Sequence, residues 1–164
     1  MILVIYNVRS AHNVGSIIRT ANGLGLSRII CTGYTPYPKL SADSRLPHES
    51  EKAARQISKT SLGAERDLDI NHVPDIERVI NDLRKKEIQI VALEQGHSAT
   101  PLSEAKISNE FALIVGNEVK GIDGQVLKMC DFIIEIPMKG TKESFNVAVA
   151  AAIAAYELTS RKSI

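Results

Sequence analysis

The sequence predicts an α/β fold in which a mostly parallel sheet is flanked by helices. Two observations lead to this prediction. Short apolar runs alternate along the chain with segments of helical periodicity, as in repeated strand–helix units. Most of the apolar runs are continuous, which is typical of strands that are covered on both faces. The strands are expected at residues 2–6, 28–31, 88–93, 112–115 and 132–136.

Helices are expected between and after these strands. In the first, apolar residues recur with the spacing i, i+3, i+4 and i+7, and they are Val14, Ile17, Ile18, Ala21 and Leu24. Asn13 is expected to cap its start, and Gly23 or Gly25 to end it. A second helix is expected over residues 75–86, acidic at its start and basic at its end, and a last helix over residues 145–161.

The chain is expected to form one domain. Its 164 residues, 44% of them hydrophobic, suffice for a core, and no repeat or linker divides residues 1–164. The least regular part is residues 33–61, which contain three prolines. We expect a surface loop there, followed by a polar helix over residues 48–59. Loops of this length are often functional.

The cysteines and apolar runs favour a cytoplasmic protein. Cys31 and Cys130 form no CxxC pair and leave no disulfide framework, which fits a reducing compartment. The N-terminal apolar run is too short for a signal peptide, and no run approaches the roughly 20 apolar residues of a membrane-spanning helix. The four histidines show no metal-site spacing, so no metal is expected.

Charge is distributed unevenly, although the net charge is only +1. Residues 1–60 carry eight Lys/Arg and three Asp/Glu, a net of +5, whereas the remainder carries twelve against sixteen, a net of −4. The basic part permits a face that binds a polyanion such as nucleic acid. Asymmetry of this size also arises by chance, so both interpretations stay open.

The last helix favours a homodimer. Every residue from 147 to 156 is apolar, and six of the ten are alanine. A helix that is apolar on all sides is buried on more than one side. One side can pack on the sheet and the other on a second copy of the chain. The alternative is the central helix of a monomer.

Several familiar active sites are absent from the sequence. No GxGxxG follows a strand and opens a helix, and there is no GxxxxGK[ST] phosphate loop. Neither HExxH nor GxSxG occurs. Three polar clusters remain, each at the end of a predicted strand, where α/β folds bind their ligands.

The first cluster leads from the first strand into the first helix. Asn13, Gly15 and Ser16 place free backbone N–H groups at a helix N-terminus, which favours phosphate or carboxylate binding. Arg19 lies off the apolar stripe, on the same side as Ser16, and can reach a ligand there. The alternative is that Asn13 only caps the helix and Arg19 is solvated.

The second and third clusters, IVGNEVKG and IPMKGTKESFN, also separate a strand from a helix. In the second, Gly116 removes a side chain where a flat ligand can lie against the backbone, and Glu118 can orient a cationic or hydroxyl group. An ordinary strand–turn–helix junction accounts for the glycines but not for the carboxylate. In the third, Ser144 and Asn146 are both cap-type residues, although one suffices.

Together the three clusters resemble one protein family. The chain carries N-x-G-x-x-x-R-x-A from Asn13 to Ala21, then IVGNEVKG, then IPMKGTKESFNVAVA. In this order and spacing they are similar to the SpoU/TrmH branch of the SPOUT methyltransferases, over nearly the whole chain. A departure is Phe145, where the family usually has Leu.

The resemblance implies a SPOUT-type fold with a deep C-terminal trefoil knot, a homodimer, and methyl transfer from S-adenosyl-L-methionine to a ribose 2'-hydroxyl of tRNA or rRNA. Because the chain has almost none of the extensions with which other members grip RNA, tRNA is slightly favoured. The cofactor-binding positions implied are Leu93, Gly116, Ile136, Ser144 and Phe145. The catalytic positions implied are Arg19, Asn13, Glu118, Ser144 and Asn146.

The resemblance also implies a role for Arg19, whose counterpart in the family is proposed to be the base. A guanidinium has a pKa above about 12, which makes proton removal by Arg19 difficult. We therefore expect Arg19 mainly to position phosphate and to stabilise the alkoxide. The other catalytic positions are expected to orient the ribose and Arg19.

Three other functions are open at this point. A SPOUT enzyme can methylate a base instead of a ribose, although Arg19 and S-F-N favour ribose. A catalytically silent RNA-binding dimer would be expected to lack Arg19, Glu118 or Asn146, and all three are present. A small-molecule nucleotide-binding module would show no salt-dependent binding of RNA.

Overall fold

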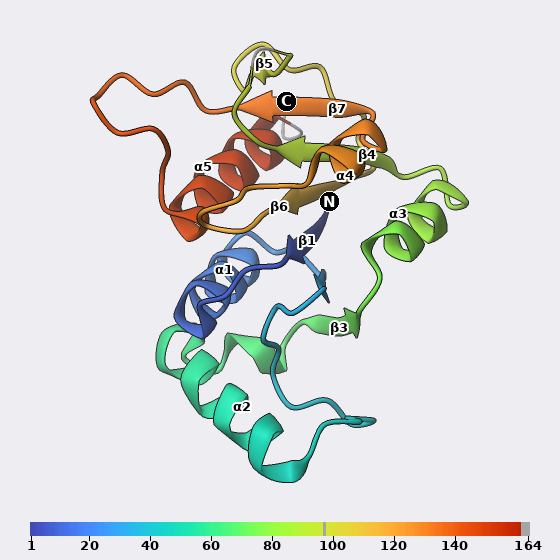
Figure 1. Cartoon of the computed structure of the whole chain (residues 1–164), viewed down its shortest axis with the longest axis vertical. Helices are drawn as coiled ribbons and strands as arrows, with labels where there is room; N and C mark the ends of the chain where they lie inside the picture. Colours follow the sequence, from blue (N-terminus) through green and yellow to red (C-terminus); the bar gives the residue numbers. More distant parts are fainter. Residues whose placement is uncertain (97, 162–164) are drawn as a thin grey trace.

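All strands of the computed structural model, which describes residues 1–96 and 98–161, lie in one sheet (Figure 1). They are β1 (Ile2–Tyr6), β2 (Arg28–Thr32), β3 (Asp69–Val73), β4 (Gln89–Leu93), β5 (Thr100–Pro101), β6 (Phe111–Val115) and β7 (Phe132–Glu135). Their order in the sheet is β3-β2-β1-β6-β4-β7-β5, and every neighbouring pair is parallel. The predicted α/β fold is confirmed.

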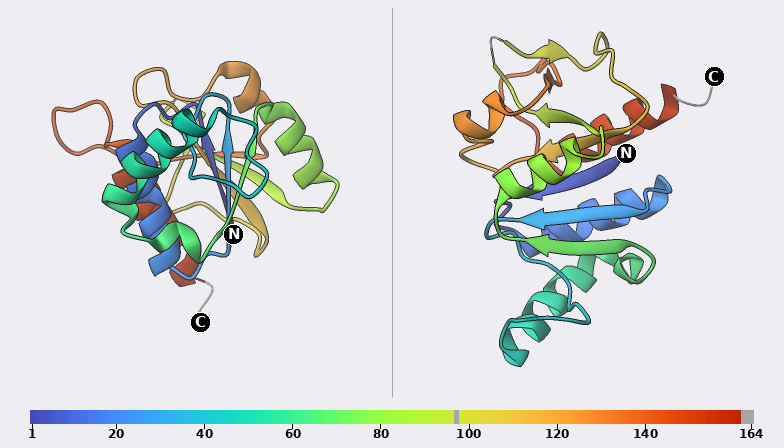
Figure 2. Two further views of the ribbon diagram at one scale, coloured as in Figure 1. Left: turned by 90° about the horizontal axis from the view of Figure 1, so that it is seen from below. Right: turned by 90° about the vertical axis from the view of Figure 1, so that its right-hand side faces the viewer.

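Helices cover both faces of this sheet. They are α1 (Ala11–Gly23), α2 (Pro47–Ser61), α3 (Ile76–Arg84), α4 (Gly124–Lys128) and α5 (Val147–Ser160), with a short 3-10 helix at Ala64–Arg66. The view along the sheet shows α1 and α5 on one face and α3 and α4 on the other (Figure 2). Each face has its own apolar core, and α2 packs on the outer side of α1.

The two strands that the sequence did not predict are the edge strands. β3 has the sequence DINHV, in which only Ile70 is buried, and β5 consists of two residues. An edge strand has one neighbour and less apolar cover, so it lacks the continuous apolar run that marks the central strands. The five predicted strands agree with the structure to within one residue at each end.

Two helix starts differ from the prediction. Ser10, not Asn13, caps α1, because the Ser10 side chain accepts the backbone N–H of Asn13 at 3.2 Å. Asn13 therefore lies inside the first turn, and its side chain is available for other partners. The last helix begins at Val147, not at residue 145, because the Asn146 side chain accepts the N–H of Ala148 at 2.9 Å and caps it.

Helix α5 is apolar on both its inner and its outer side. Its alanines pack against the sheet and α1, whereas three larger residues on the outer side stay exposed by 46%, 37% and 62%: Val149, Ile153 and Tyr156. Within residues 1–96 and 98–161, none of the helices combines the length and hydropathy needed to cross a membrane.

The order of the strands reverses between β1 and β6. From β1 the chain continues through β2 to β3 on one side, and β6, β4 and β7 lie on the other side. Because all strands are parallel, the loops after β1 and β6 leave the sheet at the same edge. In open α/β sheets, ligands bind at such a reversal of strand order.

Candidate active site

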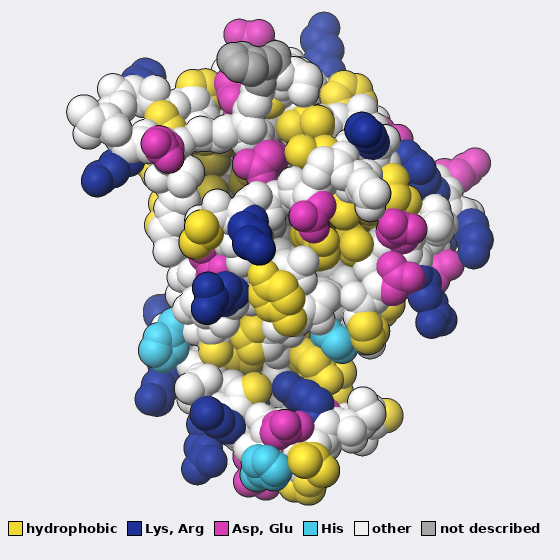
Figure 3. All heavy atoms as spheres, in the orientation of Figure 1, with side chains coloured by type: hydrophobic (Ala, Val, Ile, Leu, Met, Phe, Trp, Pro, Cys, Tyr) yellow, Lys and Arg dark blue, Asp and Glu magenta, His cyan; other side chains and the backbone are white. Residues whose placement is uncertain are grey.

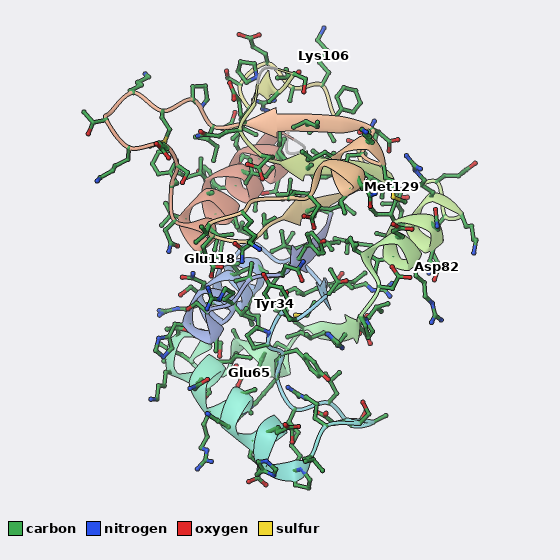
Figure 4. The ribbon with its side chains drawn as sticks, in the orientation of Figure 1. Tyr34, Glu65, Asp82, Lys106, Glu118 and Met129 are labelled. Carbon is green, nitrogen blue, oxygen red and sulfur yellow. The ribbon has the colours of Figure 1, made fainter. Side chains whose placement is uncertain are left out.

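Glu118 joins the loops that leave β1 and β6 (Figure 4). Its carboxylate accepts the backbone N–H groups of Arg9 at 3.1 Å and Ser10 at 3.2 Å. It also accepts the side-chain amide of Asn13 at 2.9 Å. These hydrogen bonds fix the start of α1 against the end of β6.

Asn146 extends this arrangement to the third segment of the chain. Its side-chain amide donates to Oδ1 of Asn13 at 3.2 Å, while its own oxygen caps α5. We name Asn13, Glu118 and Asn146 the Asn13 cluster. Asn13 is 105 residues from Glu118 and 133 from Asn146 in sequence, so only the fold brings the three together.

Hydrogen bonds donated to its carboxylate hold Glu118 in its charged form. Partial burial alone raises the pKa of Glu118, but the hydrogen bonds from Arg9, Asn13 and Ser10 outweigh it and leave the pKa below its ordinary value. Hydrogen bonds donated to a carboxylate favour the ionised state. Glu118 is consequently an acceptor and a poor proton base.

Asn117 holds the turn that presents Glu118. Its side-chain oxygen accepts the N–H groups of Val119 and Lys120 at 2.9 and 2.8 Å, as in an Asx turn. Its amide donates to the Asn7 carbonyl at 2.9 Å and to the hydroxyl of Tyr34 at 3.0 Å. Asn117 is only 8% exposed, so these bonds are protected from water.

Gly116 is required by close packing in the same turn. A Cβ at this position would lie 2.5 Å from Cγ1 of Ile122 and 2.8 Å from the backbone of Gly121. No side chain fits at these distances without a shift of the turn.

A cavity of about 280 Å³ opens next to the Asn13 cluster, between the ends of β4 and β6 and the loop before α5. The surface is hollowed beside this loop, which projects at the upper left (Figure 3). All five positions implied as cofactor-binding line the cavity: Leu93, Gly116, Ile136, Ser144 and Phe145. Its volume is near the lower limit of roughly 300 Å³ for small-ligand pockets.

The cavity wall is acidic. Four carboxylates line it, from Glu94, Glu118, Glu135 and Glu143, together with one lysine, Lys120. A wall with this excess of negative charge favours a ligand that carries positive charge.

Arg19 lies apart from the cavity in the single chain. It is exposed on α1, forms no ion pair with any residue of 1–96 or 98–161, and is not among the cavity-lining residues. Arg19 follows Asn13 by six positions on the helix. The two side chains therefore point about 120° apart around the helix axis and are offset by about 9 Å along it. Asn13 faces α5, whereas Arg19 faces outward near Ser16.

Several residues of the site were missed at the sequence level. Ser10 and Asn117 support it through contacts with distant segments, and no local pattern marks such contacts. Glu94 directly follows a predicted strand, which is the signal that singled out Glu118, and Glu135 closes another. Carboxylates at the ends of buried strands would have identified both.

A metal-binding group is not found among the residues described: no three His, Cys, Asp or Glu side chains lie where they could hold a metal ion. Two carboxylates of the cavity instead accept backbone hydrogen bonds. Glu94 accepts the N–H of Ile122 at 2.7 Å, and Glu135 accepts that of Gly96 at 3.4 Å.

Known proteins are similar to this chain in sequence and in fold. The 23S rRNA (guanosine-2'-O-)-methyltransferase RlmB of Xylella fastidiosa is 29% identical over 164 residues, which are 100% of this chain and 60% of that protein. The SpoU methyltransferase AviRb from Streptomyces viridochromogenes, solved with AdoMet, superposes with a TM-score of 0.79 at 26% identity, covering 99% of this chain and 60% of that one.

A third comparison is with a shorter protein. A structure described for the 2-OH methylation of C/U34 on tRNA superposes with a TM-score of 0.72 at 25% identity, covering 95% of this chain and 91% of that one. By contrast, the chain spans 57–60% of the length of the curated relatives it matches. The model of the SpoU rRNA Methylase family matches residues 1–156, and the chain therefore belongs to that family.

Proposed function

We propose that this chain transfers a methyl group from S-adenosyl-L-methionine to a ribose 2'-hydroxyl of RNA in the cytoplasm. The observation that carries the proposal is the Asn13 cluster beside an acidic cavity at the ends of β4 and β6. The names of relatives support it, since RlmB is called a guanosine-2'-O-methyltransferase and AviRb was solved with AdoMet.

The cavity residues fit S-adenosyl-L-methionine. When bound, the cofactor supplies a methyl group activated by a positively charged sulfonium, and it also carries an ammonium group. The four carboxylates of the wall suit this charge. Leu93, Ile136 and Phe145 offer apolar surface to the adenine, and the absent side chain of Gly116 lets a flat ring approach the backbone.

The Asn13 cluster is proposed to position the ribose. Because Glu118 is ionised and accepts several hydrogen bonds, we assign it the task of fixing Asn13, not of removing a proton. The amide nitrogen of Asn146 carries two N–H groups and donates one to Asn13. Its second N–H, together with the hydroxyl of Ser144, is available to the ribose or its phosphate.

We propose that Arg19 acts through its positive charge. A permanently cationic guanidinium stabilises the negative charge that develops on the 2'-oxygen and holds a neighbouring phosphate. Its outward position on α1 suits contact with RNA more than contact with the cofactor cavity. Proton removal by Arg19 is the less favoured role, because a guanidinium group stays protonated in proteins.

Exposed apolar side chains on α5 and directly before it support a homodimer. Val149, Ile153 and Tyr156 are exposed on the outer side of α5, and Phe145 is 39% exposed just before it. Side chains of this size are normally covered when they form a continuous patch. We propose that a second copy of the chain covers them, and that the C-terminal part is knotted as in the SPOUT fold.

We propose tRNA as the substrate class. The solved protein whose length this chain nearly matches, with 91% coverage, is described in relation to tRNA, whereas the rRNA enzyme RlmB is covered only to 60%.

The experiment is methyl transfer from tritiated S-adenosyl-L-methionine to purified tRNA and, separately, to rRNA, followed by digestion to nucleosides. We expect 2'-O-methylated nucleosides from tRNA. A methylated base would identify a base methyltransferase instead. RNA binding without any incorporation, under conditions where calorimetry shows cofactor binding, would identify a silent RNA-binding protein.

A further inference from the structure

Helix α2 carries a straight row of three cationic side chains and a histidine. His48, Lys52, Arg55 and Lys59 lie within about 60° of one another around the helix axis and extend over about 17 Å. All four are exposed. We name them the α2 row. The buried residues of the helix, Ser50, Ile57 and Ser61, lie on the opposite side.

The α2 row is not neutralised by the protein. Among residues 1–96 and 98–161, no ion pair involves Lys52, Arg55 or Lys59. The two acids of the helix lie outside the row and have other partners: Glu49 accepts the N–H of Leu46, and Glu51 lies 4.0 Å from Lys39. Arg55 and Lys59 are also spaced i, i+4, where like charges destabilise a helix.

Helix α3 shows the contrasting pattern. There Asp82 lies between Arg78 and Lys85 and pairs with both, at 3.8 and 3.0 Å. Arg84 pairs with Asp131 at 3.3 Å. These three cations at α3 are thus balanced by carboxylates, whereas Lys52, Arg55 and Lys59 of the α2 row form no ion pair among the described residues. Lys and Arg side chains gather over α2 and the start of α1 (Figure 3).

The end of the helix that carries the α2 row packs against the start of α1. The Thr60 hydroxyl donates to the His12 carbonyl at 2.9 Å, next to Asn13 in the sequence. A Cβ on Gly15 would lie 2.1 Å from Thr60 Oγ1 and 2.4 Å from the Ile57 carbonyl, so the two helices touch through backbone there. A strand that follows α2 is therefore led to the first turn of α1.

We propose that the α2 row binds the phosphate backbone of the substrate RNA and leads it to the Asn13 cluster. The inference rests on the proposed function for the identity of the polyanion. Successive cations rise by about 4.5–6 Å along the helix, which suits a row of phosphates on one strand. The row carries no apolar residue, as expected for a surface that reads backbone charge and not bases.

The test removes three charges from α2 and, as a matched control, three from α3 and the two residues that follow it. The variants are Lys52→Gln/Arg55→Gln/Lys59→Gln and Arg78→Gln/Lys85→Gln/Lys86→Gln, in the full chain. Binding of fluorescein-labelled tRNA is followed by anisotropy between about 50 and 200 mM salt. The α2 variant should bind at least about tenfold more weakly, and its slope of log K against log salt should fall by roughly 2–3. The α3 variant should change little.

Unchanged affinity and slope in the α2 variant, or equal losses in both variants, would overturn the proposal. Methyl transfer separates this result from the proposed function. If the wild-type chain binds tRNA through the α2 row but transfers no methyl group, the function fails and the docking surface stands. If it does transfer methyl groups, the α2 variant should show a higher KM for tRNA at nearly the same kcat, and an unchanged KM would contradict the docking surface.

Discussion

The two sides of the candidate site differ in how firmly they are held. On one side, the Asn13 cluster is tied by hydrogen bonds to three segments of the chain. On the other, residues 139–145 are all exposed, and the structure shows no hydrogen bond that anchors residues 137–145 within the part of the chain it describes. The side proposed to bind the ribose is preorganised, whereas the loop on the side proposed to bind the cofactor has no such anchors.

The largest expected effect comes from Glu118→Ala on the anchored side. It leaves the donors on Arg9, Ser10 and Asn13 without their acceptor, which should lower the free energy of unfolding by about 1–3 kcal/mol. Methyl transfer should fall by about a hundredfold or more, as when an oriented group of an active site is lost. Urea unfolding and the tritium assay measure the two effects.

Glu143→Ala is the matched control, because it removes a carboxylate from the same cavity but from the exposed loop. Its effect on stability should stay within about 0.5 kcal/mol. Equal destabilisation by the two substitutions would refute the comparison of the two sides.

Arg19→Ala tests a residue that belongs to neither side. Since Arg19 is exposed and does not line the cavity, cofactor binding measured by calorimetry should be nearly intact. Methyl transfer should fall by about a hundredfold. Near-normal turnover would remove Arg19 from the mechanism, and a large loss of cofactor affinity would place it in the cavity instead.

Gly116 and Gly140 test the comparison through packing alone, because Gly116 lies in the anchored turn and Gly140 in the exposed loop. Gly116→Ala forces a methyl group against Ile122 and Gly121 and should cost about 1–3 kcal/mol of unfolding free energy. A Cβ at Gly140 meets nothing within 4 Å, so Gly140→Ala should be nearly neutral. Urea denaturation of both variants measures the two changes in the free energy of unfolding. An unchanged value in Gly116→Ala would show that the turn is not held tightly.

The smallest effect expected is a pH dependence at Glu118. Its pKa in the folded chain lies below the ordinary 4.5, so its charged form stabilises the fold above pH 4.5, and this stability is lost as the pH falls through the lowered pKa. The difference in stability between the wild type and Glu118→Gln should therefore be constant from pH 7 to about 6 and shrink below about 4. A difference that grows on acidification would contradict the assignment.

The central strands could be predicted from sequence because their apolar runs are local signals. The edge strands β3 and β5 could not, since their residues are held by a single neighbour and not by a pattern of burial. Asn13 was predicted to cap α1 because it is a cap-type residue directly before the apolar stripe, whereas the structure has Ser10 in this position. The choice depends on Glu118, a partner 105 residues away from Asn13 that takes up its side chain.

The residues of the candidate site likewise divide into those that local sequence signals identified and those that they did not. The strand ends identified Gly116 and Glu118 without any structure, because ligands of parallel sheets collect there. The resemblance supplied Leu93, Ile136 and Phe145, which all line one cavity, although their role stays a prediction. The spacing on a helix is enough to turn Arg19 away from Asn13, but the sequence does not show that Asn13 contacts Glu118 and Asn146.

The pairing of β1 with β6 has a consequence for the synthesis of the protein. These strands lie side by side in the sheet, but residues 2–5 pair with residues 112–115. While the chain is being translated, β1 can pair with β2 but still exposes its other edge until residues 112–115 have been made. Such long-range parallel pairing is slow and leaves apolar edges open to other chains. The sheet can therefore close only after β6 has been synthesised, and truncations that end before β6 should aggregate.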